Sequence, residues 1–216
     1  RGVQFGNYVG QDLRSKNLNE AYDALLDLSD VLGIPSQAVS LDGTLGLAFG
    51  ARGTGRALAH YEPMQVVINL TKKRGPGSLA HEWWHALDNY FGAQKTFAGE
   101  TTDKKDLYMT VSGRSTAHRA EMKEAFDNVV KTVKESGMYQ RSLSLDNARE
   151  NPYWSSEIEL TARAFEAYVK DKLAEKGTKN DFLVNILNEK DVENPNRYQY
   201  PTKGERVKID EAFERL

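Results

Sequence analysis

The chain has 216 residues, of which 39% are hydrophobic and 28% are charged, an ordinary composition for a globular protein. Its 29 basic and 31 acidic residues give a formal net charge of −2, so no overall field draws it to nucleic acid or to a membrane surface. The absence of cysteine excludes disulfides, thiolate metal sites and a cysteine nucleophile. Histidine and carboxylate side chains are therefore the expected metal ligands.

We expect neither a membrane anchor nor a leader in this stretch of sequence. No stretch approaches the ~18 consecutive apolar residues of a membrane-spanning helix, so we expect no membrane contact. The N-terminal residues Arg1-Gly2-Val3 do not form a signal peptide. Because the chain does not begin with methionine, we expect it to be a module of a larger protein or a processed form.

The first part of the chain predicts a helix followed by a small sheet. Residues 17–32 place their apolar side chains on one stripe, which is typical of an amphipathic helix. Asn17 and Glu20 have the spacing of a capping box, and Gly33 is typical of the residue after a helix. Strand-like runs follow at residues 45–49, 57–61 and 65–70.

The rest of the chain predicts mainly helices, so the fold class is α+β. A first helix opens after residues 75–78 and runs to about Tyr90, with Gly92 just beyond it. The polar stretch 93–114 predicts an exposed excursion, that is, a long surface loop. We expect it to be the most mobile internal segment and to tolerate shortening. Further helices are expected at residues 115–136, from Pro152 to about Glu175, and at the C-terminus around residues 209–216.

Two histidines and a glutamate lie within five residues of the helix expected after residue 78, in the order His81-Glu82-Trp83-Trp84-His85. His81 and His85 would be ~40° apart around the helix and ~6 Å apart along it, so both imidazoles can reach one ion. Glu82 is rotated by ~100° from His81, where its carboxylate can take a proton from a metal-bound water. This HExxH pattern predicts a zinc site. The alternative is a helix whose two histidines are surface or core residues that bind nothing.

A catalytic zinc ion needs a third protein ligand and an open position. Glu159 is the preferred third ligand, because the small Ala162 on the same helix face would let two helices approach closely. Glu157, Glu166 and Asp88 are the alternatives. Asp88 lies on the face of His81 and His85, and its favoured role is a hydrogen bond that fixes an imidazole.

The role of Glu159, as a helix cap or as a metal ligand, depends on the residue at which the later helix begins. If that helix begins at Ser156, Ser156 and Glu159 could form a capping box. The pair Asn151-Pro152 favours an earlier start, which would place Glu159 well inside the helix.

Three weaker candidates could support the reaction. His118 and Tyr153 could each stabilise an oxyanion, although a solvated histidine and a packed aromatic ring are the favoured interpretations. Arg163 could orient a carboxylate or the substrate, while an intrahelical pair with Glu159 or Glu166 is expected equally. We expect Trp83 and Trp84 to pack in the core or to line the wall of a cleft, and we assign them no chemical role.

An HExxH helix completed by a glutamate from a later helix resembles the gluzincin clan of zinc metallopeptidases. Residues 85–90 are similar to the continuation of this helix in thermolysin-like enzymes. The resemblance implies a zincin fold, Zn²⁺ bound by His81, His85 and Glu159, and Glu82 as general base. It also implies a strand, at residues 45–49 or 57–61, that pairs with an extended polypeptide substrate.

One position departs from the gluzincin pattern. Gluzincins often carry an aspartate four residues after the glutamate ligand, where it braces a histidine, and this chain has Arg163 there. Either Asp88, Glu166 or a backbone carbonyl takes over the bracing, or the assignment of Glu159 as a ligand is wrong.

The chain also resembles the large polyvalent protein-associated domain 1 of phage and conjugative-element proteins. The segments that carry this resemblance are residues 1–7, 46–53, 81–89, 153–169 and 200–216. The resemblance implies a module of a large protein delivered with mobile DNA. We therefore expect it to be cytoplasmic or delivered into a host cell.

Together these patterns predict a zincin-like α+β unit with a small, mostly antiparallel sheet. Residues 1–92 would form a lobe with the sheet and the HExxH helix, and residues 93–216 a mainly helical part that supplies the third zinc ligand. The two parts would make one compact catalytic unit, a zinc-dependent hydrolase that cleaves polypeptide. The alternative is a zinc-binding scaffold with little or no catalysis. Direct binding of nucleic acid is not expected, because the charge is close to neutral.

Overall fold

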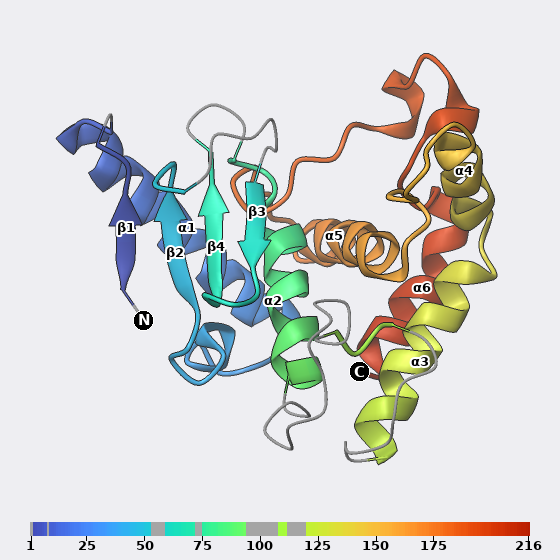
Figure 1. The fold of residues 1–216 in the computed structure, drawn as a ribbon, viewed down its shortest axis with the longest axis horizontal. Coiled ribbons are helices and arrows are strands. Elements are labelled where there is room, and N and C mark those ends of the chain that lie inside the picture. The colour runs from blue at the N-terminus through green and yellow to red at the C-terminus, as the bar shows by residue number, and fades with distance from the viewer. Residues whose placement is uncertain (1, 8, 53–58, 72–74, 94–107, 112–119) are drawn as a thin grey trace. The chain divides into compact units, whose positions relative to one another are not determined.

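The structure, a computed structural model, describes residues 2–7, 9–52, 59–71, 75–93, 108–111 and 120–216 (Figure 1). The described residues form an α+β fold, which confirms the expected class. Internal contacts divide the chain into two units. The first comprises Arg1–Leu87 and Val169–Ile186, and the second comprises Asp88–Tyr168 and Leu187–Leu216.

The first unit contains a four-stranded sheet with the order β1-β2-β4-β3 (Figure 1). Its strands are β1 (Val3–Phe5), β2 (Gly46–Phe49), β3 (Ala59–Glu62) and β4 (Val67–Leu70). β2 pairs in parallel with both β1 and β4, and only the β3–β4 pair is antiparallel. The sheet is therefore mixed, not mostly antiparallel. A helical crossover separates β1 from β2 and returns the chain in the same direction, which is what parallel pairing requires.

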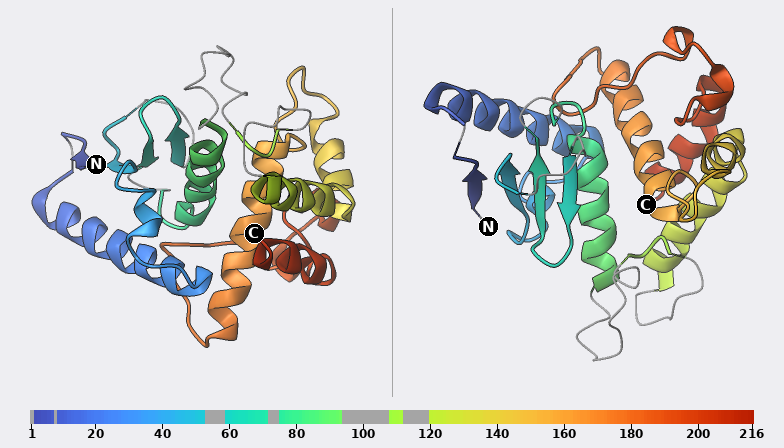
Figure 2. Two further views of the ribbon diagram at one scale, coloured as in Figure 1. Left: turned by 90° about the horizontal axis from the view of Figure 1, so that it is seen from below. Right: turned by 45° about the horizontal axis from the view of Figure 1, so that its top comes forward.

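Helix α1 (Gln11–Leu32) is that crossover, and Figure 2 shows it running along one side of the strands. It begins after Gly10, six residues before the expected Asn17, so Asn17 and Glu20 lie inside the helix and do not cap it. Its end agrees with the sequence, because Gly33 adopts a left-handed conformation with a φ of 63°. The buried side chains of this unit include Ala21, Ala24, Leu28, Ile68, Leu79, Trp83 and Trp84.

Helix α2 (Leu79–Ala93) carries the HExxH motif and extends past the expected end near Tyr90. Its start is bound by residues that lie about a hundred positions later in the sequence. The three backbone hydrogen bonds run from Gly77 N to Phe182 O (2.8 Å), from Ala80 N to Leu183 O (3.0 Å) and from Asn185 N to Gly77 O (3.0 Å). The returning segment Val169–Ile186 therefore fixes the entry of the motif helix.

The second unit is helical. Helices α3 (Ala120–Lys134), α4 (Gly137–Asp146) and α6 (Lys203–Glu214) belong to it, together with the first three turns of α5 (Glu157–Glu175). Its core includes the Phe165, Tyr168 and Phe213 rings, with Phe213 about equally distant from the other two at 5.5 and 5.4 Å. Short 3₁₀ turns of this unit lie at Glu189–Asp191 and Pro195–Arg197, and another, at Ala38–Ser40, belongs to the first unit.

The starts of α4, α5 and α6 differ from those that the sequence favoured; α6 begins at Lys203, ahead of the expected residues 209–216. α4 begins at Gly137, after an extended Ser136, and lies between the helices expected at residues 115–136 and from Pro152, where no helix was expected. α5 begins at Glu157, directly after Ser156, so it takes the later of the two starts considered and not the favoured one at Pro152, and Glu159 lies in its first turn. The backbone ahead of the helix is bound elsewhere. The Asp146 carboxylate accepts hydrogen bonds from the N–H groups of Tyr153, Trp154 and Ser155, which hold this stretch as a loop.

Some expectations fall on residues outside the described ranges: residues 57–58 of the expected strand, residues 94–107 and 112–114 of the polar excursion, and His118. Within the described ranges, none of the helices combines the length and apolar character needed to cross a bilayer.

Candidate metal centre

Helix α2 places the two histidines of the motif on one face. Their ring centroids are 4.8 Å apart and the rings meet edge to face at 81°. This follows from helix geometry, since residues four apart are neighbours on the helix surface. His85 is buried, His81 is half-buried, and Glu82 between them in sequence is buried.

Glu159, in the first turn of α5, completes a group with the two histidines. One ligand atom from each of the three side chains lies within 4.8 Å of the others. Ligand atoms on one tetrahedral zinc ion are about 3.4 Å apart, given metal–ligand distances of ~2.0–2.2 Å. Two imidazoles and one carboxylate are also a donor set that catalytic zinc sites use.

The other carboxylates considered as third ligands lie outside this group and have partners. Glu157 accepts a hydrogen bond from the Lys134 ammonium at 3.0 Å. Glu166 is hydrogen-bonded to Tyr200. Asp88 is bound by Thr110.

Asp88 is fully buried, and Thr110 uses both of its carboxylate oxygens. The Thr110 N–H donates to one oxygen at 2.9 Å and the Thr110 hydroxyl to the other at 2.5 Å. Among the described residues, the expected bond from Asp88 to an imidazole is therefore replaced by bonds from Thr110. Burial raises the pKa of Asp88 to about 7, although the hydrogen bonds from Thr110 act in the opposite direction.

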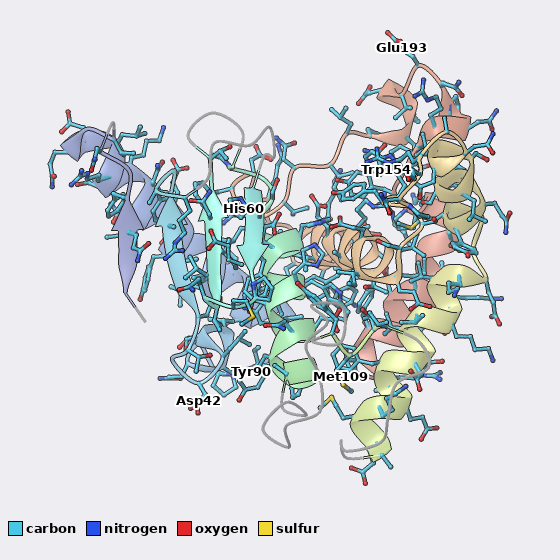
Figure 3. The ribbon with its side chains drawn as sticks, in the orientation of Figure 1. Asp42, His60, Tyr90, Met109, Trp154 and Glu193 are labelled. Carbon is cyan, nitrogen blue, oxygen red and sulfur yellow. The ribbon has the colours of Figure 1, made fainter. Side chains whose placement is uncertain are left out.

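Thr110 and its neighbour Met109, which is labelled in Figure 3, belong to the stretch expected to be an exposed excursion. Both are buried, and the Met109 N–H donates to the Asp88 carbonyl at 3.3 Å. At these two residues the expectation of exposure is wrong. Nothing in the sequence around Met109 and Thr110 indicated that these two residues would bind Asp88.

Arg163 is buried and binds backbone, not carboxylates. Its Nε donates to the Glu159 carbonyl at 3.1 Å, and its two Nη atoms donate to the Trp154 and Gln199 carbonyls. The guanidinium also lies 5.3 Å from the Trp154 ring; Trp154 is labelled in Figure 3. The expected pair with Glu159 or Glu166 is thus not a hydrogen-bonded ion pair. Burial lowers the pKa of Arg163, and the negative charge of Glu159 opposes that change.

The remaining candidates have packing roles. Tyr153 is 40% exposed, its ring meets that of Trp154 at 5.1 Å, and the Arg149 guanidinium lies 5.5 Å from it. Trp83 and Trp84 are core residues, and the Trp83 indole N–H donates to the Val39 carbonyl at 2.9 Å.

Asp146 supports the candidate site and was missed in the sequence. Besides three backbone N–H groups, it accepts a hydrogen bond from the Ser155 hydroxyl at 2.8 Å. Burial acts to raise the pKa of Asp146, but these four donors outweigh it and hold the pKa below its ordinary value. Asp146 thereby fixes the loop that leads into the turn with Glu159. Its seven- to nine-residue spacing to its partners is longer than any local capping pattern.

Comparison with protein-family models gives a match in the C-terminal part of the chain. Residues 145–216 match the family model of the large polyvalent protein-associated domain 1, which supports the resemblance to that domain. The matched part contains Glu159 and Arg163 and begins after the HExxH helix, so the segments 1–7, 46–53 and 81–89 lie outside it. Searches among curated proteins and among solved structures found no match.

Proposed function

We propose that this chain is a zinc-dependent hydrolase, specifically a peptidase that cleaves extended polypeptide. The observation that carries the proposal is the group formed by His81, His85 and Glu159, whose ligand atoms lie within 4.8 Å of one another. A carboxylate that is not part of this group, Glu82, follows the first histidine directly on the same helix. A purely structural metal site has no need of that carboxylate.

The residues divide the chemistry between them. His81, His85 and Glu159 would hold the ion, and zinc in such a site acts as a Lewis acid that lowers the pKa of water toward ~7. Glu82 is buried beside the ligands and acts as the general base, accepting a proton from the attacking water. A carboxylate held in a buried position needs little reorganisation to do this.

Two strands were considered for pairing with an extended substrate, and the strand order of the sheet favours one of them. β2 has β1 on one side and β4 on the other, so both of its edges are already paired. β3 lies at the end of the strand order, and within the described residues only β4 pairs with it. An added polypeptide strand can therefore pair with β3 and not with β2.

A second function is favoured by the match to a domain of polyvalent proteins. In this alternative the chain is a zinc-binding scaffold within a larger mobile-element protein and has little or no catalysis. The two proposals share the metal ligands and differ in the role of Glu82.

Comparing Glu82→Gln with His85→Ala tests the proposal. Glutamine keeps the volume and a polar head but cannot accept the proton. We therefore expect Glu82→Gln to retain one zinc ion per chain and to lose ~10²-fold or more of its peptidase activity. His85→Ala should lose the zinc as well. The measurements are metal content of the purified protein and cleavage of a broad peptide library.

Each contradicting result has a separate meaning. Full activity in Glu82→Gln, or a wild-type protein that holds zinc and cleaves nothing, would favour the scaffold. Loss of zinc from Glu82→Gln would make Glu82 a ligand and overturn the proposed division of roles.

A further inference from the structure

The buried guanidinium of Arg163 connects three stretches of the second unit. It donates to the Glu159 carbonyl in the first turn of α5, to the Trp154 carbonyl in the preceding loop and to the Gln199 carbonyl ahead of α6. A fourth acceptor is the Ser142 hydroxyl on α4, at 3.4 Å. Within the described chain, all four acceptors are uncharged oxygens.

This arrangement is informative because a buried charge is costly unless it is well satisfied. An arginine that served only to neutralise charge would bind a carboxylate, and the second unit contains such a case. Arg141 forms a two-pronged pair with the Glu205 carboxylate at 3.0 and 2.8 Å. Arg163 instead donates its hydrogen bonds mainly to backbone carbonyls, including those of Glu159 and Trp154. Among the described residues, the Arg163 side chain donates no hydrogen bond to the Glu159 carboxylate.

We propose that Arg163 is a positioning residue for Glu159, because its guanidinium fixes the backbone of the turn from which the Glu159 carboxylate projects. One planar group with several donors in a fixed fork holds the Glu159 and Trp154 carbonyls together. The turn is therefore restrained before any metal binds. The effect on metal affinity rests on the proposed zinc site, whereas the effect on the turn does not.

Arg141 provides a matched control. Its Nε and one Nη donate to the Tyr198 and Tyr200 carbonyls at 2.8 and 2.9 Å, so it anchors the same stretch before α6 as Arg163 does. Its hydrogen bonds go to that stretch and to Glu205, and none goes to the first turn of α5. Replacing Arg141 should loosen the second unit without releasing the Glu159 carbonyl.

The experiment compares Arg163→Met, Arg163→Lys and Arg141→Met in the full chain, with zinc alone as the probe. Zinc affinity is measured by competition with a chelating dye, and hydrogen exchange of the amides of residues 160–163 is followed in metal-free protein. We expect Arg163→Met to raise the zinc Kd ~10–100-fold, the usual scale for residues that orient a ligand. The amides of the turn should also exchange faster. Arg163→Lys should recover part of both effects, because one ammonium can still reach one or two of the carbonyls.

The control decides between positioning and general stability. Arg141→Met should lower the unfolding temperature yet leave the zinc Kd and the exchange of the turn close to wild type. Equal effects of Arg141→Met and Arg163→Met on both readouts would overturn the inference, as would an unchanged turn in Arg163→Met. If Arg163→Met does not fold, the comparison of Arg163→Lys with Arg141→Met decides in the same way.

Failure of the proposed function gives a different pattern. If wild type binds no zinc, or His85→Ala binds it equally well, the zinc site is wrong and the affinity comparison loses its basis. The exchange comparison in metal-free protein then decides alone. Faster exchange of the turn in Arg163→Met but not in Arg141→Met supports positioning, and equal exchange refutes it.

Discussion

Asp88 shows how burial of one residue changes the stability of the whole fold. In the folded protein its pKa is raised to about 7, whereas an aspartate in an unfolded chain has a pKa of about 3.9. Between these values the folded state holds a proton that the unfolded state has lost. The free energy of unfolding decreases with pH wherever the folded state binds more protons. Asp88 therefore makes the protein less stable as pH rises from about 4 to about 7.

Asp88→Asn should remove this dependence. The amide has nearly the same shape as the carboxylate but carries no charge at either pH. Urea unfolding of metal-free protein at intervals from pH 5 to pH 8 should show wild type losing up to about 1.4 kcal/mol per pH unit from this group below pH 7. The variant should lose less over the same range. Parallel profiles of the two proteins would contradict the assignment.

Individual site residues differ in how far the sequence could predict them. His81, Glu82 and His85 lie within two turns of one helix, so helix geometry alone relates their side chains. Glu159 required a choice among several carboxylates on the same later helix. The bonds from Thr110 to Asp88 and from Ser155 to Asp146 were beyond prediction, because no periodic pattern links residues at those separations.

The start of helix α2 illustrates how one element depends on another. Gly77 has a φ of +94°, and a Cβ atom at this position would lie 2.6 Å from the Asn185 Cβ. Gly77→Ala therefore faces both an unfavourable backbone conformation and a steric clash with the returning segment. Gly33→Ala is the matched control, because Gly33 also has a positive φ, of +63°, but its Cβ would meet nothing within 4 Å.

We expect Gly77→Ala to lower the free energy of unfolding by about 2–3 kcal/mol and Gly33→Ala by about 1 kcal/mol. The difference measures the close approach between Gly77 and the segment Val169–Ile186. Urea unfolding of metal-free protein gives both values. Equal losses would mean that the segment yields easily and does not restrain the helix start.

Element boundaries were predictable only where the signal is local. Gly33 ends α1 as expected, because a left-handed glycine is a property of one residue. Of the two starts considered for α5, the earlier one at Pro152 was favoured and is wrong, because Asp146, from the preceding helix, binds the N–H groups that would have begun it. The parallel pairing of β2 was missed because strand direction depends on how the chain returns, and the alternation within a strand does not encode this.

For the whole molecule, the proposed site couples metal binding to folding. A ligand that binds only the folded state at 100 times its Kd stabilises it by about 2.7 kcal/mol, a rise in the unfolding temperature of roughly 5–10 °C for a chain of this size. We expect zinc to produce this rise in wild type and in Glu82→Gln, and a chelator to reverse it. His85→Ala should show almost no response. A full response in His85→Ala would exclude that histidine as a ligand.

The chain passes between its two units three times, and this limits how the protein can be cut. A fragment that ends at Leu87 would lack Phe182, Leu183 and Asn185, which bind the start of the motif helix. A fragment trimmed to residues 145–216, the extent of the family match, would carry those residues away from their partners. Expression trials should therefore keep both stretches on one polypeptide or supply them together as two chains. The extent of a sequence match is a poor guide to the smallest piece that folds.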